Sequence, residues 1–305
     1  MPNYSLASWL PWTDRAGRLS VVKLVVFIAM LAPAFWMAFE WRAGWFSTKP
    51  LTDTIRESGD WALRILVVAL AVTPLRLVTG WNRLILVRRM LGLAALFYTL
   101  VHVALYCVDL QLDWGEILSE LVLRTYLTVG TIATLGLIVL GATSNDWSIR
   151  ELGAKRWNLL HASVYLLAVL SLLHEFMEVK IDSFEVSVLT GIFILLMGAR
   201  RMRKAGLSLN FVNLLILAPL AGVATALIEA GYYGFATGVD GWRVLAANLD
   251  FTYTIRPAWW ALGIGICMAF VSLSSGLFRR RPKPAPPAGG LVAVSSEFTG
   301  EQPQA

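Results

Sequence analysis

The chain alternates between long apolar stretches and short polar connections. Eight stretches approach the roughly 20 apolar residues that a helix needs to cross the hydrocarbon core of a bilayer. They lie at about 20–39, 61–79, 90–109, 126–142, 157–176, 184–199, 210–233 and 257–278. The fourth and sixth are short and would need interfacial residues to complete the crossing. The pattern predicts an all-α integral membrane protein, a multi-span helical bundle of about eight transmembrane helices.

Composition supports the membrane class. Of the 305 residues, 57% are hydrophobic and only 15% are charged, whereas a soluble domain needs a charged surface. The first apolar stretch lacks a small-residue cleavage site after a short core, so we expect it to be a retained span. The formal charge of +6 fits basic residues gathered in loops on one side of a membrane and does not require a nucleic-acid partner.

Basic residues fall in alternate loops. The loops after the second, fourth, sixth and eighth stretches are basic, and the intervening loops are acidic or mixed. Because basic loops face the cytoplasm, this alternation predicts that both termini are cytoplasmic. The basic loop residues are Arg76, Arg83, Arg88, Arg89, Arg150, Lys155, Arg156, Arg200, Arg201, Arg203, Lys204, Arg279, Arg280, Arg281 and Lys283.

The three histidines, His102, His161 and His174, all lie in apolar stretches. A histidine inside a bilayer is costly and usually faces the bundle interior, where it relays protons or holds a cofactor. Imidazole is a preferred axial ligand of haem iron. The cysteines Cys107 and Cys267 form no CxxC or CxxCH, so a covalent c-type haem, an iron–sulfur cluster and a zinc ribbon lack ligands. These features favour a b-type cytochrome.

Two of the histidines are expected to lie at similar depth in the membrane. With the third and fifth stretches both running outward, His102 and His174 lie at similar depth and could clamp one haem. His161 precedes His174 by 13 positions, roughly 20 Å along a helix and about 140° around it, so it can have a different role. Each histidine could instead be a hydrogen-bonded interior residue. A proton relay usually recruits a mid-membrane acid, and Glu229 is the acid well inside a stretch.

Two arginines are candidate cofactor contacts. Arg88 lies 14 positions before His102, at the level of His161, and could pair with a haem propionate or simply be a cytoplasmic helix-end arginine. Arg64 lies close to Trp61 and Asp60 near the external interface. It could meet the outer haem's propionates or extend to the interface.

The pattern of apolar stretches also predicts how the chain divides into segments. We expect a cytoplasmic segment at 1–19, a haem-binding transmembrane core at 20–204, a two-helix extension at 205–280 and a cytoplasmic tail at 281–305. The tail is rich in Pro, Gly and Ala and is expected to be disordered. The chain shows no GxGxxG or P-loop, so a donor that uses NAD(P)H would be another polypeptide.

Three strings carry a family resemblance: SGDWALRILVVALAVTPLRLVTGW, RRMLGLAALFYTLVHVALY and TSNDWSIRELGAKRWNLLHASVYLLAVLSLLHEF. They resemble the MsrQ (YedZ) family, the haem-binding membrane subunit of the bacterial periplasmic methionine sulfoxide reductase system, in the ferric-reductase-like transmembrane group. The resemblance covers roughly 20–204, a six-helix core. The wider group often has two histidines on each of two helices, and Arg88 stands where the fourth would be.

The resemblance implies an electron-transfer subunit rather than a stand-alone enzyme, in the bacterial inner membrane. Electrons would enter from a quinone pool or a cytoplasmic flavin reductase and cross by one or two haems b. They would leave to a periplasmic molybdopterin enzyme that repairs methionine sulfoxide. His102, His161 and His174 carry over as the family's histidines. FMN is a further cofactor that rests on the resemblance alone.

The chain differs from the family in one respect, and this leaves alternative functions open. Family members commonly end after the sixth span, whereas this chain adds two apolar stretches and a connection that could contact a periplasmic partner or mark a different acceptor. A ferric or quinone reductase with a small-molecule acceptor is one alternative. A haem-free transporter or scaffold is another, although no internal repeat is visible and Pro33, Pro74 and Pro219 are weak signs of broken helices.

Overall fold

The computed structural model describes residues 10–13, 17–179, 182–252 and 254–278. The expected tail at 281–305, the basic cluster at 279–281 and much of the 1–19 segment lie outside these residues. The helices are α1 (Val21–Ala43), α2 (Pro50–Thr79), the 3-10 turn η2 (Asn82–Val87), α3 (Arg88–Asp109), α4 (Trp114–Leu123), α5 (Thr125–Ala142), α6 (Asp146–Ala162), α7 (Val164–Glu178), α8 (Phe184–Lys204), α9 (Phe211–Thr237), α10 (Gly241–Ala247) and α11 (Pro257–Phe278).

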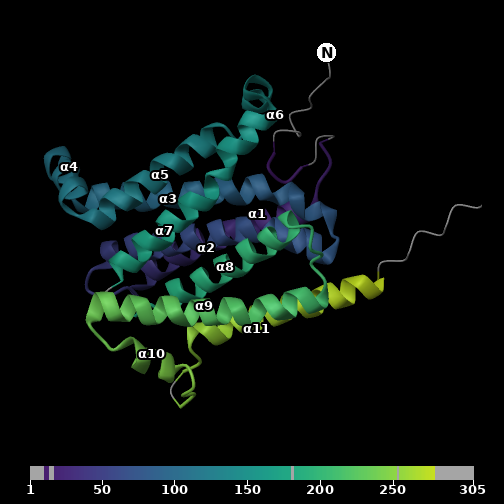
Figure 1. Cartoon of the computed structure of the whole chain (residues 1–305). Helices are drawn as coiled ribbons and strands as arrows, with labels where there is room; N and C mark the ends of the chain where they lie inside the picture. Colours follow the sequence, from purple (N-terminus) through teal and green to yellow (C-terminus); the bar gives the residue numbers. More distant parts are fainter. Residues whose placement is uncertain (1–9, 14–16, 180–181, 253, 279–305) are drawn as a thin grey trace, which may run out of the picture.

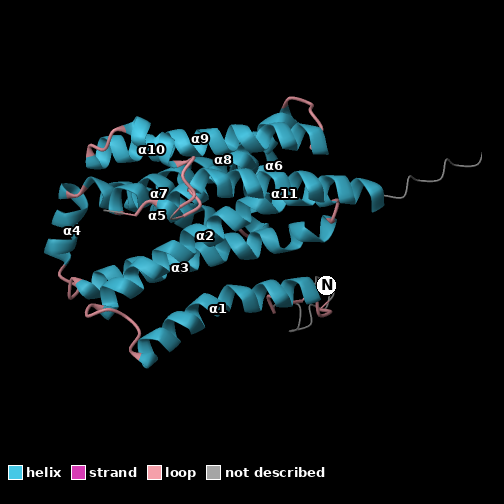
Figure 2. Cartoon of the chain, turned by 90° about the horizontal axis from the view of Figure 1, so that it is seen from below, coloured by secondary structure: helices cyan, strands magenta, loops and turns pink. Residues whose placement is uncertain are grey.

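Most of the long helices run side by side in one bundle (Figures 1 and 2). α2 packs against α3, α5 against α7 and α9 against α11, while α8 contacts α2, α7, α9 and α11. α1 lies at the edge of the bundle (Figure 2). We call the end that holds Asp60, Glu175, Glu178 and Glu185 the acidic end, and the end that holds Arg76, Arg88, Arg89 and Arg201 the basic end.

The all-α membrane architecture is confirmed. Seven helices of the described chain are long and apolar enough to cross a membrane, by length and composition. The stretch at 184–199, the remaining one of the eight expected, forms α8, whose apolar centre is flanked by Glu185 and by arginines from Arg200 onward. The fifth stretch extends from Asp146 to Glu178, with a non-helical residue at Gly153. Neither short helix, α4 or α10, was expected from the sequence.

Pro33 interrupts α1, and a tyrosine from α3 repairs the break. A proline kink separates the carbonyl and N–H groups that would otherwise pair across one turn. The hydroxyl of Tyr98, only 2% exposed, donates to the Met30 carbonyl at 2.7 Å and accepts from the Ala34 N–H at 3.1 Å. It therefore bonds both the i and the i+4 group beside the proline, which matters because lipid offers no substitute partner.

Pro74 in α2 has an equivalent partner in Arg200. Proline lacks the N–H that would pair with the carbonyl four residues earlier, here Leu70. Arg200 of α8 donates to that carbonyl at 2.7 Å and to the Tyr165 hydroxyl at 3.2 Å. The distribution of loop charges predicts that Arg200 lies in a basic loop. The structure instead gives it a place between helices, because an arginine at a helix end can extend to an unpaired carbonyl.

Small residues bring α8, α9 and α11 close together. A Cβ added to Gly191 of α8 would overlap Thr225 and lie 2.7 Å from the Ala261 Cβ, and one added to Gly265 would lie 2.6 Å from the Ala218 Cβ. Close backbone approach at small residues is a common basis of helix association in lipid. The two-helix extension is therefore packed tightly onto α8.

An ion pair near the acidic end links α9 to the segment that precedes α11. Glu229 of α9 is 1% exposed and lies 3.0 Å from Arg256, just before α11. The Glu229 carboxylate thus acts as an anchor for the segment between α10 and α11. This contact gives the one mid-span acid noted in the sequence a structural role.

We predict that Tyr98→Phe destabilises the protein. Removing the hydroxyl takes a hydrogen-bond partner from the Met30 carbonyl and from the Ala34 N–H, and a buried group left without a partner costs about 1–3 kcal/mol. A lower melting temperature in detergent would measure the loss. Tyr106→Phe is the matched control, because in the described chain the Tyr106 hydroxyl has no hydrogen bond. Equal melting temperatures for the two variants would contradict the bridging role.

Candidate functional site

His102 and His174 face each other near the acidic end. His102 lies on α3 and His174 on α7, and their ring centroids are 6.4 Å apart with the ring planes at 83°. Both side chains are partly buried in the bundle. Two residues separated by 72 positions are thus brought together at the depth that the sequence suggested.

Each of the two rings is held by a backbone carbonyl of a neighbouring helix. His102 Nδ1 lies 2.7 Å from the Ile55 oxygen of α2, and His174 Nδ1 lies 2.8 Å from the Tyr126 oxygen of α5. Since a carbonyl oxygen can only accept, Nδ1 must carry the proton in both rings. Nε2 is then the unprotonated nitrogen. This is the tautomer in which metal-ligating histidines are usually fixed.

The spacing suits two ligands on one metal ion. A metal–imidazole bond is about 2 Å long, so two ligating nitrogens are about 4 Å apart and the ring centroids are further apart still. The 6.4 Å between the centroids agrees with this geometry. The donor set of two neutral imidazoles with fixed tautomers fits a haem iron with two axial histidines.

Two glycines lie directly against these rings. A Cβ on Gly59 of α2 would be 3.0 Å from His102 Nδ1, and a Cβ on Gly130 of α5 would be 2.8 Å from His174 Nδ1. Both distances are shorter than an ordinary contact of about 3.5 Å. The rings therefore occupy space that only a glycine leaves free.

His161 has a different environment near the basic end. Its ring stacks on Trp157, with centroids 3.9 Å apart, and its Nε2 lies 3.1 Å from the Thr143 hydroxyl. The Thr143 hydroxyl also lies 2.8 Å from the Val139 carbonyl; because a hydroxyl can donate as well as accept, this contact does not fix the tautomer of His161. The Nε2 partner of His161 is thus a side-chain hydroxyl, whereas the Nδ1 partners of His102 and His174 are backbone carbonyls.

A cavity of about 310 Å³ adjoins His161. Arg88 and Arg89 line it, and Arg89 also pairs with Asp146 at 2.8 Å. Gly92 lines it too, and a Cβ there would meet nothing within 4 Å. The cavity thus combines open space, two cations and an imidazole, a set that could hold an anionic cofactor. The other lining residues are Leu66, Ala69, Leu70, Ile85, Leu93, Leu137, Leu140, Gly141, Ser144, Trp157 and Val164.

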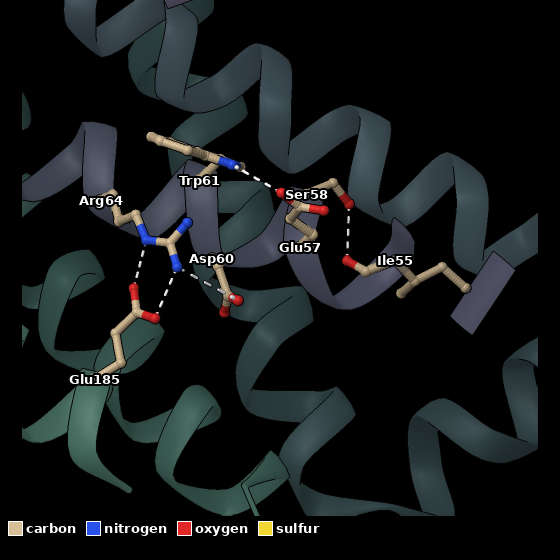
Figure 3. A network of polar contacts seen from close by, with 7 residues as sticks. All are labelled: Ile55, Glu57, Ser58, Asp60, Trp61, Arg64 and Glu185. Atoms are coloured by element: carbon tan, nitrogen blue, oxygen red, sulfur yellow. Dashed lines mark hydrogen bonds and ion pairs between the residues drawn. The ribbon is translucent and has the colours of Figure 1, made fainter. Parts of the chain in front are cut away.

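Arg64 is already paired with carboxylates, as Figure 3 shows. Its guanidinium makes two hydrogen bonds to Glu185 of α8, one of 2.7 Å, and lies 3.8 Å from Asp60. It also lies over the Trp61 ring, 4.7 Å from the centroid. These contacts hold α2 to α8.

The surroundings of Arg64 are acidic. Asp60 has Glu175, Glu178 and Glu185 as charged neighbours, and Arg56 pairs with Glu178 at 3.0 Å. A propionate placed here would meet these carboxylates as well as the arginine. The geometry therefore favours a structural role of Arg64 over propionate pairing.

The sequence pointed to the three histidines and Arg88 as candidates, but it did not point to the groups that lie against the imidazole rings. Gly59, Gly130 and Thr143 were not singled out. A glycine inside a helix costs about 1 kcal/mol relative to alanine, so two interior glycines were a usable signal. The carbonyls that accept from the histidines could not be predicted from the sequence, because every residue has a backbone carbonyl.

Comparison with known proteins identifies the family. The family described as the ferric reductase like transmembrane component matches residues 58–172, which include His102 and His161. No solved structure matches the chain.

Curated relatives share the name "Protein-methionine-sulfoxide reductase heme-binding subunit MsrQ". The protein from Rhodospirillum rubrum is 40% identical over 199 residues, 63% of this chain and 93% of the relative. That from Polaromonas naphthalenivorans is 37% identical over 198 residues, 64% of this chain and 90% of the relative. That from Herminiimonas arsenicoxydans is 37% identical over 179 residues, 58% and 82% of the two chains. With relatives matched over most of their length, the chain belongs to the MsrQ family.

Proposed function

We propose that this protein is the haem-binding electron-transfer subunit of a methionine sulfoxide reductase system. The observation that carries the proposal is the facing pair His102 and His174, each with Nδ1 bonded to a backbone carbonyl. The names of the relatives, which are haem-binding subunits, support the same conclusion. The chain would act as a redox subunit of a larger complex rather than as a stand-alone enzyme.

The chain's own residues would ligate and tune a b-type haem. His102 and His174 would hold the haem iron through Nε2. Haem supplies one-electron transfer when bound. The carbonyls of Ile55 and Tyr126 fix the ring tautomers and raise the basicity of the ligands, and burial in the bundle limits access of water. Ligand basicity and burial are two of the levers that set a haem potential.

The cavity beside His161 would take a second cofactor, either another haem or FMN. Propionates and phosphate share an anionic chemistry that suits Arg88 and Arg89. His161 Nε2 is hydrogen-bonded to the Thr143 hydroxyl, so iron ligation through this nitrogen would require that bond to be exchanged. Of the two roles open to Arg88, pairing with an anionic group of this cofactor is the one that the cavity favours.

The proposed orientation of the protein in the membrane rests on the difference in charge between the two ends of the bundle. The positive-inside rule places the basic end in the cytoplasm, with both termini there, in a bacterial inner membrane. Electrons would enter at the basic end, from quinol or a flavin reductase, and leave at the acidic end. The acceptor would be a periplasmic molybdopterin-containing catalytic subunit.

An optical spectrum tests the proposal first. Purified protein from haem-supplemented cells should give a sharp b-type band in the dithionite-reduced minus oxidised spectrum, with one or two haems per chain. A flat spectrum in well-folded protein would contradict haem binding and favour a transporter or scaffold. Rapid reoxidation by iron or quinone without a catalytic subunit would favour a reductase with a small-molecule acceptor.

We predict that His102→Ala and His174→Ala each abolish the low-spin haem at the acidic end, because each would remove one of the two imidazoles proposed to hold the iron. His161→Ala should leave that haem's spectrum intact, and so serves as the matched control. Haem per polypeptide and low-spin electron paramagnetic resonance check the outcome. A full haem complement in both His102→Ala and His174→Ala would show that the pairing is wrong.

We predict that Gly92→Leu removes the cofactor at the basic end. The new side chain would fill the cavity beside His161, while the haem held by His102 and His174 should remain. Cofactor content, measured as haem and flavin per chain, should fall by one cofactor. Gly231→Leu in α9 is the control, since a Cβ there also meets nothing within 4 Å. Unchanged content in Gly92→Leu would place the second cofactor elsewhere or nowhere.

We predict that Arg64→Met weakens folding and spares haem binding. The partly exposed pair with Glu185 contributes about 1 kcal/mol, so the melting temperature should fall slightly at constant haem content. Arg56→Met, which breaks the pair with Glu178, is the control at the same end. Loss of haem from Arg64→Met alone, at an unchanged melting temperature, would instead support propionate pairing.

A further inference from the structure

The two facing histidines are held by the same local arrangement on two different helices. On α2, the carbonyl of Ile55 accepts from His102 and the residue four positions later is Gly59. On α5, the carbonyl of Tyr126 accepts from His174 and the residue four positions later is Gly130. The helices are unrelated in sequence around these positions. The glycine four residues after the accepting carbonyl therefore reflects a physical requirement of the histidine–carbonyl bond rather than a shared local sequence.

Helix geometry supplies that requirement. In an α-helix the carbonyl of residue i points toward the N–H of residue i+4, so a ring that bonds this carbonyl from the side must lie over residue i+4. A Cβ at Gly59 would be 3.0 Å from Nδ1 and 3.1 Å from Cε1 of His102; at Gly130 the same distances to His174 are 2.8 and 2.9 Å. Any larger residue would push the imidazole away from its carbonyl.

Comparison with the other glycines shows that this contact is specific. Gly136, Gly141 and Gly198 are nearest to leucine side chains, as expected for helix packing in lipid. Among the helical glycines of the described residues, Gly59 and Gly130 are the two whose nearest neighbour is an imidazole. Helix stability does not favour them, because alanine would be better by about 1 kcal/mol at each position.

We propose that Gly59 and Gly130 are positioning residues that set the Nδ1–H···O=C bonds of His102 and His174, and through them the potential and affinity of the bound haem. The proposal rests on haem ligation by these histidines, as put forward above. A bond from Nδ1–H makes the imidazole a stronger donor. A stronger donor stabilises the oxidised iron, so loss of the bond raises the midpoint potential.

The two positions should differ in sensitivity. The contact at Gly130 is closer than that at Gly59, so an added methyl group displaces His174 further. The Ile55 carbonyl also accepts from the Ser58 hydroxyl at 2.8 Å (Figure 3), and it is therefore already shared between two donors. Both differences point to a larger effect at Gly130.

The test compares Gly59→Ala and Gly130→Ala with Gly263→Ala in the full-length protein. A Cβ at Gly263 of α11 meets nothing within 4 Å, so that variant carries the same chemical change without the contact. Haem affinity, the low-spin resonance spectrum and the midpoint potential are measured on detergent-purified protein. We expect affinity to fall about 10-fold or more, the potential to rise and the spectrum to shift, with Gly130→Ala affected most and Gly263→Ala unchanged.

The outcomes separate this inference from the proposed function. If wild-type protein binds haem and both glycine variants match Gly263→Ala in all three measurements, the positioning role is wrong and haem ligation stands. If folded wild-type protein binds no haem, the proposed function itself fails. Should an alanine variant not fold, pulsed resonance on wild-type protein with ¹⁵N-labelled histidine reads the Nδ1–H bonds directly; two strongly bonded ligands support the role and weakly bonded ligands overturn it.

Discussion

The absence of water in the bilayer core governs this structure. Every backbone carbonyl and N–H that a helix does not pair internally needs a partner from the protein. Side chains meet this need where prolines interrupt helices: Tyr98 bridges the break in α1 and Arg200 reaches the Leu70 carbonyl in α2. The same kind of bond, from side chain to the carbonyl of a neighbouring helix, holds His102 and His174. Helix association and the orientation of the two histidine rings thus use one kind of interaction.

Charge is separated along the bundle, and the two candidate cofactor sites differ accordingly. At the acidic end, Arg64 is matched by Glu185 and Asp60, which leaves the neutral imidazoles as the groups suited to a metal. At the basic end, Arg88 and Arg89 line open space beside His161, which suits an anion. The proposed direction of electron flow, from basic to acidic end, follows the positive-inside rule.

The extension formed by α9, α10 and α11 is joined to the rest of the bundle. Apolar residues of α2, α8, α9 and α11 form one cluster that includes Val78, Leu195 and Leu214, and Ser275 of α11 donates to the Val78 carbonyl at 2.9 Å. The division into a core at 20–204 and an extension at 205–280 therefore follows the sequence resemblance more closely than it follows the packing.

The sequence by itself determined the membrane class, the approximate spans, the three histidines and the level that Arg88 shares with His161, because hydrophobic length and helical rise are local properties. The tertiary structure decided which helices meet, and therefore that Ile55 and Tyr126 accept from the histidines, that Gly59 and Gly130 make room for them, and that Arg64 pairs with Glu185. It also placed α8 against α2, α7, α9 and α11 and set the His161 ring against Trp157 and the Thr143 hydroxyl. These features depend on the rotation of each helix about its axis and on the carbonyls of its neighbours, and backbone carbonyls are the same for every residue type.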